Sequence, residues 1–176
     1  MLPGFPHHLT QRGNRGQRTF FAQDDYRTYL ALLAEWCCRC GVAVWPYCLM
    51  PNDLHLIVVP KAEDGLRRAI GEAHRRYTRS VNVKHGWRGH LWQGRVASYA
   101  LDTTYLLACA RHLAADPDDG TVRVLHRHET TGRPAGSARF LTRAEKQLGR
   151  VVRPQRPGRK KQSTRNEYVP RFGRTR

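Results

Sequence analysis

A strand–turn–strand segment in the first third of the chain constrains the fold most strongly. Residues 42–50 and 53–59 are both rich in apolar, β-branched and aromatic side chains, as strands are. The Pro51-Asn52 pair between them is typical of a tight turn. The two segments are therefore expected to pair as an antiparallel hairpin.

Helical patterns flank this hairpin on both sides. Residues 24–40 carry apolar side chains at helical spacing, with Asp24 as the expected N-cap and Gly41 as the stop. A second helix is predicted from Asp64 or Gly65 to about residue 83, and further helices over 103–115 and 139–148. The apolar stripe of the second helix is formed by Leu66, Ile70, Ala73, Tyr77 and Val81.

Two more strands, over residues 7–11 and 95–99, complete the pattern. The order strand, helix, strand, strand, helix, strand is the ferredoxin-like pattern. It predicts an α+β fold, with an antiparallel sheet, helices on one face and a basic C-terminal tail.

The charge of the chain indicates a polyanionic partner. The formal net charge is +17 over 176 residues, which favours nucleic acid first and an anionic membrane surface second. From residue 150 onward there are ten Lys or Arg residues and one Glu without apolar periodicity, so this tail is expected to stay disordered until it meets nucleic acid.

The sequence gives no sign of a membrane or secretory protein. It has no apolar run long enough to cross a bilayer and no secretory signal, so we expect a cytoplasmic protein without membrane partners. Its five cysteines lack zinc-ligand spacing and are expected to be reduced.

Four segments occur in an order that is specific in combination. They are HHLTQRGNR (residues 7–15), YCLMPNDLHL (47–56), RRYTRSVN (75–82) and GHLWQGR (89–95). Together they resemble the REP-associated tyrosine transposases, a family of single-tyrosine HUH nucleases. The HUH motif of that family is histidine, a bulky apolar residue and histidine, whereas this chain has Asp53, Leu54 and His55.

The resemblance implies a domain organisation, a partner and a setting. Residues 1–115 would be the transposase core, 116–149 a shortened helical or irregular appendage, and 150–176 the basic tail. The partner would be single-stranded or hairpin DNA, and the protein would be bacterial and nucleoid-associated. Monomeric and homodimeric arrangements both occur in the family, so both stay open.

The predicted metal site is built on the second strand of the hairpin. Alternation places Asp53 and His55 on one face of that strand. The resemblance implies that they hold Mg²⁺ or Mn²⁺, for which carboxylate is a suitable ligand, and Asn82 is a weaker candidate for an additional ligand. From the residues alone, Asp53 would be a turn residue and His55 a sheet histidine.

Tyr77 is the candidate nucleophile, on the strength of the resemblance. Its attack on a DNA phosphodiester would form a 5′-phosphotyrosine link and free a 3′-hydroxyl. Helical periodicity alone favours the alternative, a core tyrosine.

Basic and aromatic residues around these segments are the candidate DNA contacts. Exposed arginines and amides would contact phosphates, and an exposed tryptophan would stack on bases. The candidates are Arg12, Asn14, Arg15, Arg75, Arg76, Arg79, Trp87, Arg88 and Arg95.

Two functions follow from these features. The first is a metal-dependent transposase that nicks and rejoins single-stranded DNA at palindromic hairpin repeats. The second is a catalytically inactive or domesticated relative that binds DNA hairpins without cutting them. Tyr77 and His55 favour the first, and Asp53 favours the second.

Overall fold

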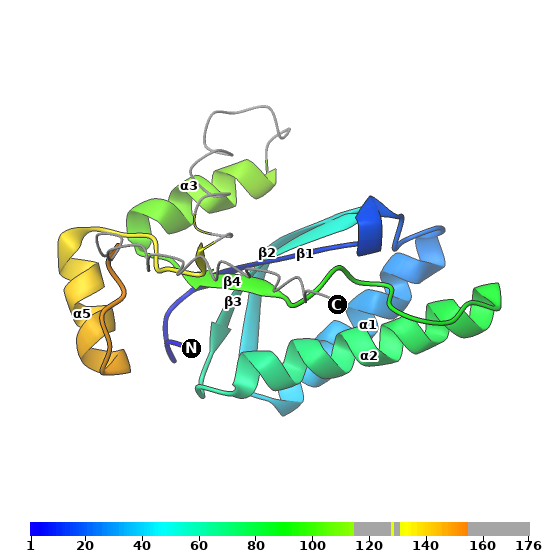
Figure 1. Ribbon diagram of the computed structural model, residues 1–176, viewed down its shortest axis with the longest axis horizontal. Helices are drawn as coiled ribbons and strands as arrows, with labels where there is room; N and C mark the ends of the chain where they lie inside the picture. The colour runs from blue at the N-terminus through cyan, green and yellow to red at the C-terminus, as the bar shows by residue number, and fades with distance from the viewer. Residues whose placement is uncertain (115–127, 129–130, 155–176) are drawn as a thin grey trace, which may run out of the picture.

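A computed structural model describes residues 1–114, 128 and 131–154. Figure 1 shows a central sheet with helices on both sides of it. The elements are β1 (His7–Arg12), a short 3-10 turn η1 (Asn14–Gly16), α1 (Gln23–Arg39), β2 (Val42–Met50), β3 (Asp53–Pro60), α2 (Gly65–His85), β4 (Ala97–Ala100), α3 (Thr103–Ala114) and α5 (Ala138–Leu148).

The sheet confirms the α+β fold and the hairpin predicted from sequence. Its strand order is β2-β3-β1-β4 and every neighbouring pair is antiparallel, which is the ferredoxin-like arrangement. Met50 pairs with Asp53, so Pro51 and Asn52 form the two-residue turn. The last strand begins at Ala97 rather than at residue 95, because pairing with β1 runs from Thr10–Ala97 to His7–Ala100.

One face of the sheet carries the main core under α1 and α2. Leu54, Leu56 and Val58 of β3 are fully buried there with Tyr29 of α1 and Tyr77 of α2. Burying apolar side chains of this size contributes about 1.5–3 kcal/mol each. The apolar stripe predicted for α2 is the surface that it buries.

The other face is covered by α3, a difference from the prediction that the helices lie on one face. Ile57 and Tyr99 project to this side, and Cys109 of α3 packs against them. In Figure 1, α1 and α2 lie on one side of the sheet and α3 on the other. The prediction therefore holds for α1 and α2 only.

The C-terminal part packs against the N-terminal segment. Phe140 and Ala144 of α5 form a small cluster with Leu2, Ala100 and Val152. The C-terminal tail is expected to be disordered, but its residues from 155 onward lie outside the described part of the chain. No described helix is long and apolar enough to cross a membrane.

The start of α1 differs from the prediction and depends on Asp25 rather than Asp24. The N-cap is Ala22, and the Asp25 carboxylate accepts hydrogen bonds from the backbone N–H groups of Phe21 (2.8 Å) and Ala22 (2.9 Å). The Lys84 ammonium lies 2.8 Å from the same carboxylate. Burial opposes ionisation of Asp25, but these hydrogen bonds hold its pKa below the usual value.

We expect Asp25→Asn to destabilise the fold by about 2 kcal/mol, because it removes charge-assisted hydrogen bonds that join α1 to the end of α2. Urea denaturation measures this free energy of unfolding. Asp24→Asn is the matched control, since the Asp24 side chain is exposed and contacts only Arg27 among the described residues. Equal effects of the two substitutions would contradict the role given to Asp25.

Acid should destabilise the protein through His74. Burial lowers the pKa of His74 to about 3 from an ordinary 6.5. As the pH falls, His74 therefore becomes protonated at a lower pH in the folded state than in the unfolded state. Stability from neutral His74 is complete above pH 6.5 and is lost as the pH falls toward 3. The buried His7, whose pKa is lowered to about 4, adds a similar contribution.

The test compares the unmodified protein with the variant His74→Phe. In the unmodified protein the ring centroids of His74 and Trp92 lie 4.4 Å apart, and phenylalanine keeps an aromatic ring in contact with Trp92. Between pH 6.5 and 3, the free energy of unfolding should fall less steeply in the variant. Since His7 is present in both proteins, its contribution cancels. Parallel pH curves would show that His74 is not the acid-sensitive group.

Candidate functional site

Asp53 and His55 lie together on the face of the sheet away from α1 and α2. Their neighbours Leu54 and Leu56 are buried in the main core, so alternation along β3 turns both polar side chains to the opposite face. His55 Nε2 is 3.9 Å from Asp53 Oδ2. The structure therefore brings these two predicted ligands together.

Two further residues extend this pair across the sheet. His8 Nε2 is 3.1 Å from His55 Nδ1, and the Tyr99 hydroxyl is 2.8 Å from His8 Nδ1. Alternation along β1 turns only one of His7 and His8 to this face, and it is His8. Tyr99 was not predicted, because its position opposite His8 depends on the β1–β4 register.

The hydrogen-bonding capacity of these side chains permits one continuous chain. If Tyr99 donates to His8 Nδ1, His8 Nε2–H donates to His55 Nδ1, and His55 Nε2–H then faces Asp53. In the reverse direction, His55 Nδ1–H donates to His8 Nε2, and His55 Nε2 carries a lone pair. Only this second arrangement suits a metal ligand.

Asp53 and His55 provide only two of the six donors that a Mg²⁺ ion takes. In an octahedral site with bonds near 2.1 Å, adjacent ligands lie about 3 Å apart and opposite ligands about 4.2 Å apart. The Asp53 and His55 donors are 3.9 Å apart. No group of three or more His, Cys, Asp or Glu side chains that could hold a metal occurs in the described part of the chain.

Asn82, the weaker predicted ligand, does not join this pair. It lies on α2, which packs against the other face of the sheet, and its amide donates to the Gly89 carbonyl at 3.0 Å. The metal set suggested by the sequence is thus divided between the two sides of the sheet.

Tyr77, the predicted nucleophile, lies inside the main core. Its side chain is 1 % exposed and packs against Phe20 and Tyr29. Its hydroxyl donates to the Thr19 carbonyl at 2.7 Å. Burial first, and then the nearby Asp25, raises its pKa above the ordinary value of 10. The structure does not bring Tyr77 to Asp53 and His55.

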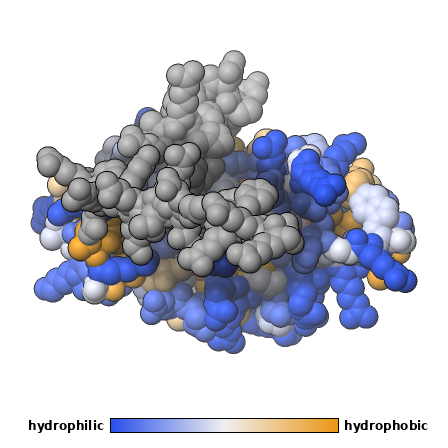
Figure 2. Space-filling view, viewed as in Figure 1, coloured by the Kyte–Doolittle hydropathy of each residue, from blue (hydrophilic) through white to orange (hydrophobic). Residues whose placement is uncertain are grey.

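The outer side of α2 presents a basic surface. Glu72 binds Arg75 (2.8 Å) and Arg76 (3.5 Å), and the Arg76 guanidinium also lies over the Trp36 ring. Arg79 and Arg88 are exposed and have no ion pair with any described acidic residue. Hydrophilic side chains cover most of the visible surface over α1 and α2 (Figure 2).

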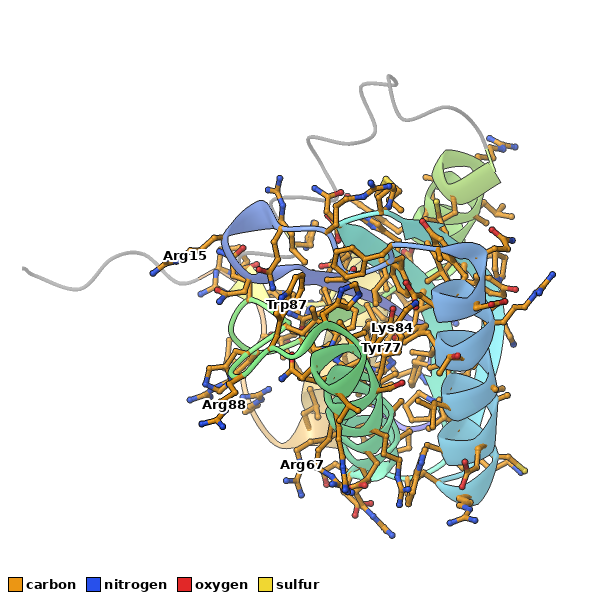
Figure 3. All side chains as sticks on the ribbon, turned by 90° about the vertical axis from the view of Figure 1, so that its right-hand side faces the viewer. Arg15, Arg67, Tyr77, Lys84, Trp87 and Arg88 are labelled. Atoms are coloured by element: carbon orange, nitrogen blue, oxygen red, sulfur yellow. The ribbon has the colours of Figure 1, made fainter. Side chains whose placement is uncertain are left out.

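Adjoining hollows run along this surface from α2 to η1. The first includes Arg76 and Lys84, the second Arg79 and Trp87, and the third Trp87, Arg88 and Asn14. Neighbouring hollows share lining residues, so we treat them together as the basic groove. Figure 3 shows Arg15, Trp87 and Arg88 on the same side of the molecule. Arg12 and Arg95 are exposed but do not line the groove.

Two of the solved structures that are similar to this chain are transposases. A REP-associated tyrosine transposase bound to a REP hairpin is 15 % identical, with a TM-score of 0.49, over 77 % of this chain and 88 % of that one. A candidate transposase from Deinococcus radiodurans R1 is 14 % identical, with a TM-score of 0.48, over 77 % of this chain and 95 % of that one.

Among curated proteins, none matches the chain significantly. The family described as IS200-like transposases matches residues 7–111, which include the four sheet strands, α1, α2 and most of α3. Because this match spans more than half of the sequence, the chain belongs to the IS200-like transposase family.

Proposed function

We propose that this transposase relative binds single-stranded or hairpin DNA along the basic groove and does not cut it through Tyr77. The proposal rests on one observation: the sheet lies between Tyr77 and the pair Asp53 and His55. Tyr77 lies in the core under α1 and α2, whereas Asp53 and His55 face the other side.

Tyr77 is held in a state unsuited to nucleophilic attack. A phenol must ionise to attack a phosphodiester readily, and burial raises the pKa of Tyr77. Its hydroxyl also donates to the backbone carbonyl of Thr19, a fully buried residue. To reach DNA, the Tyr77 ring would have to leave a packed cluster of aromatic side chains.

A divalent ion, when bound beside a scissile phosphate, polarises it. Asp53 and His55 would offer such an ion two protein donors. DNA binding along the basic groove needs neither this pair nor a metal, because arginine contacts phosphate directly.

The groove has the chemistry that nucleic acid binding requires. Arg79 and Arg88 supply positive charge for phosphates, within a chain of net charge +17. Trp87 is 46 % exposed and offers an aromatic surface for stacking on an unpaired base. Charge and stacking in one groove favour a strand with unpaired bases.

Nicking and rejoining through Tyr77 is the competing function, and the proximity of Asp53 to His55 favours it. It requires a rearrangement that exposes Tyr77 on the side of these two residues. A covalent assay separates the two functions directly.

Incubation with an end-labelled hairpin carrying a single-stranded extension, in Mg²⁺ or Mn²⁺, should give no covalent protein–DNA adduct. Tyr77→Phe should behave identically, while losing about 1 kcal/mol of stability with its hydrogen bond to Thr19. Asp53→His should also give no adduct, because it restores a ligand without moving Tyr77. An adduct that disappears in Tyr77→Phe would overturn the proposal.

Arg79→Ala and Arg88→Ala should each weaken DNA binding and reduce the slope of log K against log salt by about 0.7, as expected for one phosphate contact on a single strand. Fluorescence anisotropy over a salt series measures this slope. Arg67→Ala is the control, since Arg67 is equally charged and exposed but lies twelve residues before Arg79, about 18 Å along the helix. Equal slopes for all three variants would place the DNA elsewhere.

A further inference from the structure

The third hollow of the basic groove contains three carboxamide side chains beside an exposed tryptophan. Asn14 and Gln17 come from the turn after β1, and Asn82 comes from the end of α2. Trp87, Arg88, Gly89 and His90 complete the lining. We name this hollow the amide pocket. Most of its polar capacity is uncharged, unlike that of the rest of the groove.

The loop that follows α2 lies against the NH₂ group of each carboxamide, most closely against that of Asn82. The NH₂ groups of Asn82, Gln17 and Asn14 lie 3.0, 3.3 and 3.5 Å from the backbone carbonyls of residues 89, 91 and 90, respectively. A carbonyl accepts only from the NH₂ arm, so each side-chain oxygen lies on the opposite arm of its amide. None of these three oxygens accepts a hydrogen bond from the described part of the chain, so each can accept one from a ligand.

The backbone around Asn14 is held in place before any ligand binds. Its N–H donates to the Leu91 carbonyl at 2.8 Å, and Gly13 forms a bridge with Trp92. The next residue, Arg15, has a φ of 55°, a left-handed conformation that costs a non-glycine residue about 1–2 kcal/mol. Such strain persists where the surrounding contacts determine the turn.

Trp87 packs against two aromatic side chains and keeps part of its ring exposed to solvent. His85 stacks on its ring at a centroid distance of 4.6 Å and an interplanar angle of 27°, and Phe21 meets it edge-on at 5.5 Å. With 46 % of its surface still exposed, the indole retains a free area for stacking. Base stacking on an aromatic side chain contributes about 1–3 kcal/mol.

We propose that the amide pocket holds one unpaired adenine or cytosine, the two bases that carry an exocyclic amino group on the major-groove edge. The base stacks on Trp87, its amino group donates to carboxamide oxygens, and Arg88 contacts the adjoining phosphate. Thymine has no amino group and presents carbonyl oxygens instead, which face those same acceptors unfavourably. The inference rests on the proposed DNA-binding function and adds base selectivity to it.

The test measures binding of labelled oligodeoxyadenylate, oligodeoxycytidylate and oligothymidylate of equal length by anisotropy. The unmodified protein should bind the first two at least about fivefold more tightly than the third, as expected for one discriminating base contact. In Asn14→Ala/Asn82→Ala this preference should disappear. Gln147→Ala, which removes a carboxamide on α5, is the matched control and should keep it.

Trp87→Ala should weaken binding of all three strands by about fivefold or more. Trp45→Ala is its control, because Trp45 is 45 % exposed but lies on β2, outside the groove. Unfolding midpoints of every variant establish that each is folded.

Equal affinity of the unmodified protein for the three strands would overturn the base selectivity while leaving DNA binding in place. A preference that survives in Asn14→Ala/Asn82→Ala would also overturn it, by locating the selectivity elsewhere. No binding to any of the three strands would overturn the inference, and no binding to the hairpin with a single-stranded extension either would refute the proposed function itself.

Discussion

Side chains alternate between the two faces of the sheet along β3, and this alternation positions both the main core and the polar pair. Leu54, Leu56 and Val58 must face α1 and α2 to form the main core, so Asp53 and His55 must face the other way. Shifting the strand by one residue would bury the carboxylate and expose the leucines. The polar pair is therefore positioned by the apolar residues between which it lies.

α2 carries both the core and the basic groove. Its buried stripe includes Tyr77, while Arg79, two residues later, points to solvent. Gly86 ends the helix in the left-handed conformation and turns the chain back, which places Trp87 beside Asn82. Lys84, in the last turn, binds Asp25 near the start of α1 and complements the negative end of the helix dipole. The same helix end is thus joined to the core and lines the basic groove.

Periodicity and turn chemistry predicted much of the fold, since the hairpin, α1, α2 and their apolar stripes depend on local residue order. The placement of Asp53 and His55 on one face also followed from alternation. His8, Tyr99 and Gln17 join their sites through strand register and loop contacts between distant segments, which no local pattern encodes.

For Tyr77, helical periodicity predicted a core position and the motif predicted a nucleophile. The packing agrees with the periodicity, because aromatic rings surround the side chain.

The barrier between Tyr77 and Asp53 is a layer of hydrogen-bonded backbone. The turn at Pro51 and Asn52 precedes Asp53 directly, and the Pro51 carbonyl accepts from the backbone N–H groups of Thr19 (2.7 Å) and Phe20 (3.1 Å). Thr19 in turn accepts the Tyr77 hydroxyl. Withdrawing the Tyr77 side chain would break its hydrogen bond to Thr19 and uncover Phe20, which is fully buried and packs against the Tyr77 ring. Leaving such groups without partners costs about 1–3 kcal/mol each. DNA binding along the outer side of α2 requires none of this opening, so the same packing that confines the tyrosine leaves the groove intact.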